Sequence, residues 1–288
     1  PFDFSEANMT GSLWFAEGFT SYYTGLMLCR AEVKTPEEYI ESLSGTFNYV
    51  WNSPALEYFN PIEMSYQAPF VDAATSVDPT NWENTFISYY SYGSVLGLAL
   101  DLSLRQKGLN LDDFMKLMWK NHGKSEVTYK VEDIEKTLAN YAGAEFSDNF
   151  FSNYNYQSKM PDYQELFKGV GIKLEQKKEN YFGASVKETD SGLEITRNTF
   201  KGSPTYEAGL TAGDVILNLN GTEVKTTKEM DEIIQNSETK RIKVSFERFG
   251  EKKITEVQLG ESPAYIISLD ENASKKALKN RKNWLEAK

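Results

Sequence analysis

Histidine and cysteine are almost absent from the sequence, which contains one of each, His122 and Cys29. A single cysteine excludes an internal disulfide framework and leaves the redox compartment open. A catalytic zinc site with three protein ligands normally uses at least two histidines, or histidine together with cysteines. These 288 residues therefore cannot complete such a site by themselves.

Long apolar runs and an excess of basic residues are also missing. The longest stretch without a charged residue, residues 84–100, is interrupted by polar side chains, so we expect no membrane span. The net charge of −11 argues against a nucleic-acid binder, whose surface would be basic. The chain starts at Pro1 and shows no signal peptide, so we expect a processed or truncated piece of a longer protein. Whether that protein is periplasmic or cytoplasmic stays open.

The residues that are present suit a globular protein with two domains. Apolar residues make up 40% of the chain and charged residues 25%, which is typical of folded domains. Aromatic residues reach 14%, enough for a sizeable core. The length of 288 residues favours two domains over one.

The first part of the chain has a helical pattern. Apolar residues at spacings of three and four predict helices at residues 15–29, from 36 to 50, and at 86–106, 111–122, 131–141 and 147–154. Gly123 is expected to end the fourth of these as a left-handed cap. Residues 53–79 contain four prolines and no clean period, which predicts a long ordered loop.

The last third of the chain is β-rich and ends in a basic tail. Alternating apolar residues predict strands at residues 183–187, 193–197, 215–219, 242–246 and 254–259, with one helix at 227–236. We therefore expect a helical domain at 1–165, a small β-rich domain at 166–261 and a basic helical tail at 262–288. Trp284 and Leu285 are expected to dock this tail back onto the protein.

Glu17 stands alone in an apolar helix. It is the only charged residue between Glu6 and Arg30, and its neighbours indicate a helix buried on nearly every side. A buried carboxylate is costly unless it is paired, hydrogen-bonded or bound to a metal. On composition alone, a structural ion pair or a partner for the helix dipole, with Ser12 as the cap, is the favoured explanation. Gly18 indicates the close approach of another backbone or of a ligand.

The segment around Glu17 carries a family resemblance. Residues 13–23, LWFAEGFTSYY, resemble the Trp-x-x-Glu-Gly-Phe segment of gluzincin zinc aminopeptidases, and most of all the bacterial glycyl aminopeptidase family. The resemblance implies that Glu17 is the third zinc ligand of an aminopeptidase that removes small residues such as glycine or alanine. The His-Glu-x-x-His helix that provides the other ligands and the base is absent here. We expect it upstream of Pro1, and we expect this piece alone to be inactive and to bind no zinc tightly.

A tyrosine-rich helix supplies the candidate for oxyanion stabilisation. Residues 87–97 carry no charge, and Gly93 and Gly97 share one face, which permits close helix packing. A core helix whose tyrosines find hydrogen-bond partners is one interpretation. By resemblance to other gluzincins, Tyr90 in the pattern Tyr-x-x-Gly donates to the tetrahedral intermediate, although Tyr89 or Tyr92 could take its place. For His122 we expect no catalytic or metal role, and for Cys29 a place in the core.

The β-rich part resembles a PDZ domain, with residues 202–216, GSPTYEAGLTAGDVI, as its central signature. PDZ domains bind peptides by adding a strand to a sheet edge and holding the C-terminal carboxylate in a loop. The resemblance assigns Tyr181, Phe182 and Gly183 to that loop, and Met230 and Ile234, with Ile233, to the side-chain pocket. A domain that only scaffolds the protein, with its groove filled from within, is the alternative.

The fold expected from these features is α+β. It consists of the all-helical C-terminal half of a gluzincin (thermolysin-like) catalytic domain, followed by a small β-rich PDZ domain. The expected function is that of a C-terminal piece of a zinc metallopeptidase that acts on peptides or proteins. The alternative is a non-catalytic PDZ protein that binds peptides or serves as a scaffold.

Overall fold

The computed structural model describes residues 5–6, 8–71 and 81–286 and divides into two compact units. The helical unit contains the described residues up to Val71, together with Thr85–Glu175 and the residues from Tyr265 onward. The β-rich unit contains residues 81–84 and Gln176–Ala264. The finer division at residues 165 and 261 stays a prediction of the sequence, whereas the α+β class is confirmed.

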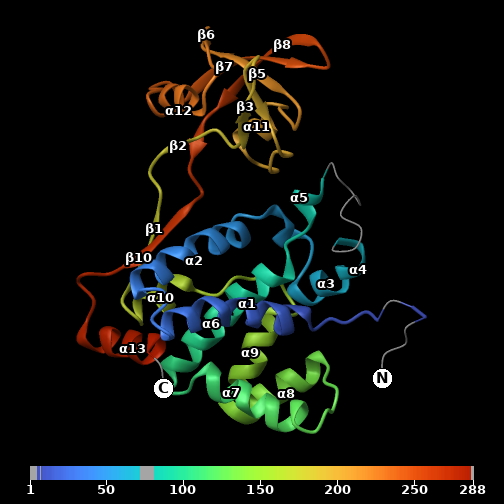
Figure 1. Ribbon diagram of the computed structural model, residues 1–288, viewed down its shortest axis with the longest axis vertical. Helices are drawn as coiled ribbons and strands as arrows, with labels where there is room; N and C mark the ends of the chain where they lie inside the picture. The colour runs from blue at the N-terminus through green and yellow to red at the C-terminus, as the bar shows by residue number, and fades with distance from the viewer. Residues whose placement is uncertain (1–4, 7, 72–80, 287–288) are drawn as a thin grey trace. The chain divides into compact units, whose positions relative to one another are not determined.

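The helical unit is formed by two long helices and a set of shorter ones (Figure 1). Its elements are α1 (Leu13–Arg30), α2 (Pro36–Trp51), η1 (Pro54–Glu57), α3 (Pro61–Tyr66), α4 (Ala68–Val71), α6 (Tyr89–Gln106), α7 (Leu111–Met118), η2 (Trp119–Gly123), α8 (Val131–Ala142), α9 (Ala144–Tyr154), α10 (Tyr163–Lys168) and α13 (Lys275–Leu285). In addition, β1 (Ile172–Gln176) and β10 (Tyr265–Leu269) pair to form a two-stranded sheet.

The prediction of a long loop after α2 is wrong for the described part of that segment, which forms η1, α3 and α4. Pro54 and Pro61 each occupy the first turn of a helix, where a missing N–H costs nothing. Ser53 and Asn60 cap those turns with their side chains. The prolines therefore begin helices here. The rest of the predicted loop lies outside the described residues.

Two glycines let α1 and α6 cross with their backbones in contact. A Cβ atom built on Gly18 would lie 2.3 Å from the Cα of Gly93, and one on Gly93 would lie 1.8 Å from the carbonyl oxygen of Trp14. A Cβ on Gly97, one turn later, would meet the Phe19 ring at 3.1 Å. The predicted close approach at Gly18 is confirmed, and its cause is another helix backbone.

Two predicted helix ends are wrong in detail. The Ser12 side chain makes no capping bond to α1, and the Ser12 carbonyl instead accepts the N–H groups of Phe15 and Ala16. Gly123 is no left-handed cap either, because α7 passes into a turn of π-helix, η2, that ends there. In that turn a Cβ on Gly123 would lie 2.2 Å from the Trp119 ring, so this exposed side chain packs over the glycine.

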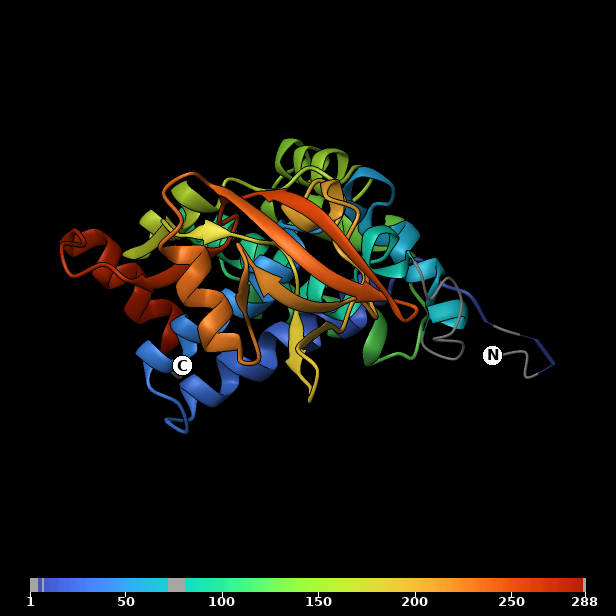
Figure 2. The same ribbon diagram turned by 90° about the horizontal axis from the view of Figure 1, so that it is seen from above.

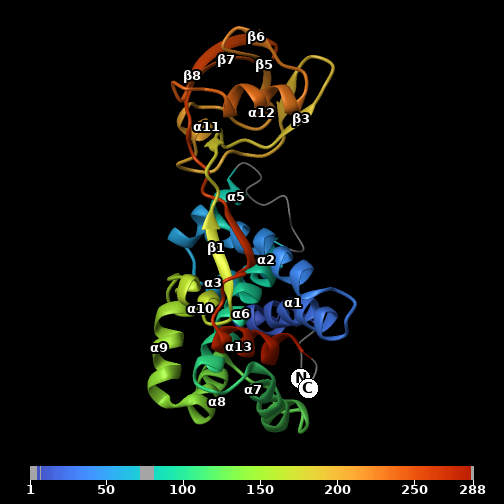
Figure 3. The same cartoon turned by 90° about the vertical axis from the view of Figure 1, so that its left-hand side faces the viewer.

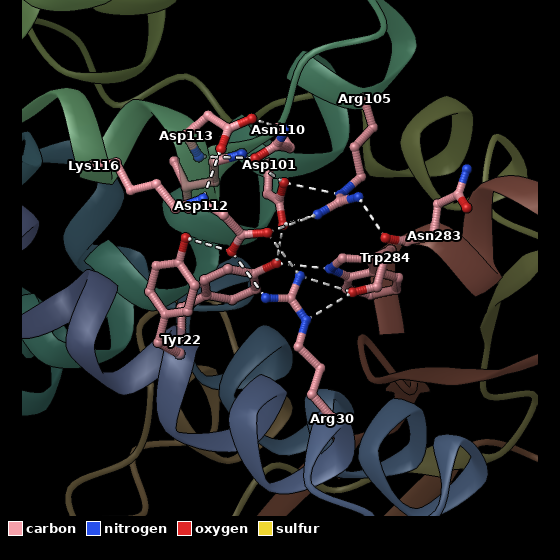
Figure 4. Close-up of polar contacts among 12 residues, drawn as sticks. Tyr22, Arg30, Asp101, Arg105, Asn110, Asp112, Asp113, Lys116, Asn283 and Trp284 are labelled. Carbon is pink, nitrogen blue, oxygen red and sulfur yellow. Dashed lines mark hydrogen bonds and ion pairs between the residues drawn. The ribbon is translucent and has the colours of Figure 1, made fainter. Parts of the chain in front are cut away.

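The predicted docking of the C-terminal tail is confirmed within the helical unit. Trp284 at the end of α13 is fully buried, and Leu285 beside it is buried as well. The Trp284 indole N–H donates to the Tyr22 hydroxyl at 2.8 Å, and Tyr22 donates to Asp101 at 2.7 Å (Figure 4). Burial, with Asp101 as the next cause, raises the pKa of Tyr22 well above its usual value, so this hydroxyl stays protonated and can donate.

Two arginines bind the last carbonyls of α13. Arg30 donates to the Trp284 carbonyl at 2.9 Å and forms a bidentate pair with Asp112 at 2.9 and 3.1 Å. Arg105 donates to the Asn283 carbonyl at 3.0 Å (Figure 4). Burial alone would raise the pKa of the Asp112 carboxyl, but the hydrogen bonds and charge of Arg30 hold that pKa below its usual value. The two arginines therefore donate hydrogen bonds to carbonyl groups that have no partner within the helix at its C-terminus.

Replacing Trp284 by Phe is expected to lower the free energy of unfolding by about 1–3 kcal/mol, because it leaves a void and removes the donor to Tyr22. Urea unfolding of the 288-residue chain measures the change. Leu278→Ala on the exposed face of the same helix serves as the control and should stay within about 0.5 kcal/mol of the parent. Equal effects of the two changes would contradict a docked tail.

The β-rich unit is a twisted antiparallel sheet with one long helix against it. Strands β3 (Val186–Glu188), β4 (Leu193–Ile195), β5 (Val215–Leu219), β7 (Arg241–Arg248) and β8 (Glu251–Gln258) follow in that order, and β6 (Thr222–Glu223) pairs with β5. The β7–β8 hairpin is the long orange ribbon of Figure 2. A second pair joins β2 (Asn180–Tyr181) to β9 (Gly260–Glu261). Helices α5 (Trp82–Thr85), α11 (Pro204–Glu207) and α12 (Thr227–Gln235) complete the set of elements.

Candidate functional site

Glu17 lies in the second turn of α1 and is half-buried. Within residues 5–6, 8–71 and 81–286 its carboxylate makes no hydrogen bond or ion pair. The expectation of a helix buried on nearly every side is wrong, because α1 exposes an uncharged face that includes Ala16, Thr20 and Met27. Glu17 stands at the edge of this face. The interpretation as a structural ion pair therefore has no partner in the described part of the chain.

The described residues do not fit a complete zinc site. They contain no group of three or more histidine, cysteine, aspartate or glutamate side chains that could hold a metal ion together. His122 lies in the η2 turn with its ring edge-on to Tyr129, 5.7 Å between centroids. Cys29 is buried in α1. Glu17 can therefore provide one ligand at most, and no chemical step through a metal follows from these residues.

The three candidate tyrosines at the start of α6 differ sharply in exposure. Tyr90 is 40% exposed, whereas Tyr89 is 3% and Tyr92 is 0% exposed. The Tyr90 ring stacks on Tyr89 with 5.1 Å between centroids. Burial raises the pKa of the Tyr92 hydroxyl above its usual value. Of the three phenols, Tyr90 alone has substantial access to a substrate.

Glu17 and Tyr90 flank the same helix crossing. Glu17 precedes Gly18 in α1, and Tyr90 precedes Gly93 by three residues in α6, an axial rise of about 4.5 Å. The contact between Gly18 and Gly93 leaves no space for a side chain, so it fixes the spacing of the two helices. Both candidate residues therefore lie within one helical turn of this contact.

In the β-rich unit, the predicted carboxylate loop follows β2. Thr205 holds it from one side, because its N–H donates to the Phe182 carbonyl at 3.1 Å and its hydroxyl to the Gly183 carbonyl at 2.7 Å. Gly183 has φ +95°, and a Cβ there would lie 2.8 Å from the Cβ of Ser203. Within the described residues the backbone N–H groups of Phe182, Gly183 and Ala184 have no hydrogen-bond acceptor. The loop therefore offers three free backbone N–H donors, the kind of group that can hold a peptide carboxylate.

The strand after this loop is an open edge. β3 is the first strand in the sheet order and pairs only with β4 among the described strands, so its other edge is free. Helix α12 contacts both β2 and β3, and Figure 3 labels α12 and β3 in this unit. Phe182 from the loop, together with Met230 and Ile234 from α12, belongs to the core of this unit. Tyr181 is half-buried, and Ile233 packs against that core.

Two contacts that join α12 to β2 and to β3 were not predicted from the sequence. At one end, Gln235 exchanges two hydrogen bonds with the backbone of Asn180, at 2.9 and 2.8 Å. At the other end, Glu188 accepts the N–H and hydroxyl groups of Thr227 at 3.0 and 3.2 Å. A capping box of Thr226 and Glu229 can be recognised in a sequence, and it fixes where α12 begins. The start of α12 in turn places Thr227 for its contact with Glu188.

Two known protein families match separate parts of the chain. Residues 1–96 match the M61 glycyl aminopeptidase family, and residues 201–248 match the PDZ domain family. The chain carries a glycyl aminopeptidase segment and a PDZ domain. The recognition made from residues 13–23 and 202–216 is thereby confirmed. No curated protein matches the chain.

Among solved structures, this chain is similar to an aminopeptidase N family protein from Idiomarina loihiensis. The identity is 24% and the TM-score 0.86, and the match covers all of this chain and 51% of that protein. This chain thus spans about half the length of the neighbour, and the likeness shows a shared fold. A serine endoprotease from Yersinia pestis, at 21% identity and a TM-score of 0.26, matches 29% of each chain. The HtrA3 PDZ domain with a phage-derived ligand matches 34% of this chain and 93% of its own, at 14% identity and a TM-score of 0.26.

None of the helices in the described ranges is both long and apolar enough to cross a membrane. The longest two, α1 and α6, are held together by their glycine contact inside the helical unit.

Proposed function

We propose that the whole protein is a zinc aminopeptidase that releases small N-terminal residues such as glycine or alanine. The chain is peptidase-related by its M61 segment and by the aminopeptidase fold that it shares. The observation that carries the proposal of a zinc enzyme is the environment of Glu17. Its carboxylate has no ionic partner in the described residues, and the exposed face of its helix is otherwise uncharged. Such a group is free to bind a metal.

In this proposal Glu17 is one zinc ligand, and the other ligands and the general base come from outside these 288 residues. The scarcity of histidine supports this, as does a chain that spans half of its structural neighbour. When bound, zinc would polarise the scissile carbonyl and activate a water molecule. The 288-residue piece alone is then inactive and binds zinc only weakly.

Tyr90 is proposed to donate a hydrogen bond to the oxyanion that forms on the substrate carbonyl. Its exposure supports this choice over Tyr89 and Tyr92. A neutral phenol donates well at neutral pH, because its ordinary pKa is near 10.

Tyr90→Phe in the full-length protein is expected to lower kcat about 100-fold with little change in zinc content. Tyr66→Phe, another exposed tyrosine of the helical unit, is the control. Unchanged kcat in Tyr90→Phe would exclude the role.

The PDZ domain is proposed to bind the C-terminal ends of peptides or proteins beside β3. The free edge of β3 and the three unbonded N–H groups of residues 182–184 support this proposal. The alternative, a non-catalytic PDZ scaffold, keeps this binding but needs no zinc. The metal content and activity of Glu17 variants distinguish the two.

Gly183→Ala is expected to weaken the binding of peptides with an apolar last residue at least about 10-fold. The change forces an alanine into positive φ and against Ser203, which turns the N–H groups away from the carboxylate. Fluorescence anisotropy with the 288-residue chain measures the affinity. Gly260→Ala, where the added Cβ meets only Pro204 at 3.5 Å, should bind like the parent. Wild-type affinity in Gly183→Ala would remove the carboxylate loop from the proposal.

A further inference from the structure

The side of α12 that faces β2 and β3 carries three residues four positions apart: Thr227, Asp231 and Gln235. Residues at this spacing lie on one face of a helix. The outer two are bonded to Glu188 and Asn180, so their contacts fix which face is turned toward the strands. Asp231 lies midway between these end contacts on α12, the helix that contacts the edge strand β3.

Asp231 is exposed and makes no ion pair or hydrogen bond with any described residue. Helical side chains lean toward the N-terminus of their helix, so its carboxylate leans toward the end where Glu188 lies. Lys187 on β3 points to the opposite side of the strand, where it pairs with Glu194 at 3.0 Å. We call the space between α12 and the free edge of β3 the groove. The charges that face this stretch of the groove, from α12 and from β3, are therefore negative.

The opposite end of the groove carries the lysines. A pocket of about 460 Å³ next to Asn180 and Gln235 is lined by Lys177, Lys178 and Lys240. Glu179 and Glu261 also line it, and they pair with Lys177 and Lys240 at 3.7 and 3.8 Å. This is the end at which the carboxylate loop begins. A peptide with a negative end and a positive side chain further back matches this order of charges.

The groove has a defined length. Thr227 and Gln235 are eight residues apart, which corresponds to about 12 Å along the helix. An extended peptide advances about 3.3 Å per residue, so three to four residues fit between the end contacts. Alternate side chains of an added strand point to the same side. With the last side chain at Phe182, Met230 and Ile234, the third-from-last side chain faces Asp231.

We propose that the PDZ groove selects C-terminal peptides with an apolar last residue and a lysine or arginine at the third-from-last position. Asp231 is the residue that recognises the cation. This inference rests on the proposed peptide binding of the PDZ domain and adds the chemical class of the ligand.

The test compares three labelled peptides on the 288-residue chain, ending in Lys-Ala-Val, Gln-Ala-Val and Glu-Ala-Val. The lysine peptide should bind about 3- to 5-fold more tightly than the glutamine peptide at low salt, as expected for an exposed ion pair. The glutamate peptide should bind most weakly. Added salt should remove the differences, because the charges are exposed.

Variants then assign the effect to one carboxylate. Asp231→Asn should abolish the preference for lysine, and Asp231→Lys should reverse it in favour of the glutamate peptide. Glu232→Gln removes the same charge from the next position of α12, where the side chain faces solvent and lies 3.8 Å from Lys228, and should preserve the preference. Equal binding of all three peptides to wild type, or an unchanged preference in Asp231→Asn, overturns this inference and leaves peptide binding intact. Absence of binding by every peptide overturns the proposed peptide binding itself.

Discussion

Glu17→Gln in the full-length protein is expected to lower zinc affinity and aminopeptidase activity by at least about 100-fold. Loss of a residue that only supports a metal ligand already costs about 10- to 100-fold, and loss of a ligand costs more. Glutamine keeps the size of the side chain and removes the charge that binds the metal. Zinc per protein by mass spectrometry and hydrolysis of peptides with N-terminal glycine or alanine are the measurements.

The stability of the same variant separates a ligand from a structural carboxylate. Glu17 has no hydrogen bond or ion pair in the described part of the chain, so Glu17→Gln should change the unfolding free energy of the metal-free protein by less than about 0.5 kcal/mol. Glu41→Gln, an exposed carboxylate on α2, is the control for both measurements. A large loss of metal-free stability in Glu17→Gln with unchanged zinc content would make Glu17 structural.

Gly93→Ala is expected to destabilise the helical unit by at least about 3 kcal/mol, the upper end of what overpacking usually costs. The added Cβ would fall 1.8 Å from the Trp14 carbonyl oxygen and 2.8 Å from the Cα of Gly18. Both obstacles are backbone, so no side-chain rotation relieves the collision and the helices must separate. Chemical unfolding of the 288-residue chain reports the change.

Gly45→Ala provides the matched control, because it makes the same substitution inside helix α2, where nothing lies within 4 Å of the new Cβ. Alanine favours a helix over glycine, so this variant should gain about 0.5–1 kcal/mol. If Gly93→Ala unfolded like Gly45→Ala, the close crossing of α1 and α6 would be wrong.

The sequence was most informative where local chemistry decides the structure. Residues 215–219 were predicted as a strand and form β5, because alternating apolar residues end at the tight turn of Asn220 and Gly221. The predicted start of the second helix at residue 36 is confirmed in α2, where a capping box of Thr35 and Glu38 fixes it. The close approach at Gly18 was predicted from one glycine in an apolar helix, although its partner could not be named.

The sequence was least informative where residues far apart in the chain meet. Nothing local to Arg30 indicates that it binds Asp112, or that both lie next to the last turn of a helix more than two hundred residues later. The prolines of residues 53–79 predict a loop, but Pro54 and Pro61 begin helices because capping residues precede them. The same limit applies to the candidate site, since the free edge of β3 and the end contacts of α12 depend on pairing between distant segments.

Zinc-edge anomalous diffraction from crystals of the full-length protein tests the central claim most directly. The account predicts one zinc peak about 2.0–2.2 Å from a carboxylate oxygen of Glu17, the distance of a zinc–carboxylate bond. The Tyr90 side chain should face the same cavity. A zinc peak bound elsewhere, with Glu17 turned to solvent, would contradict the account.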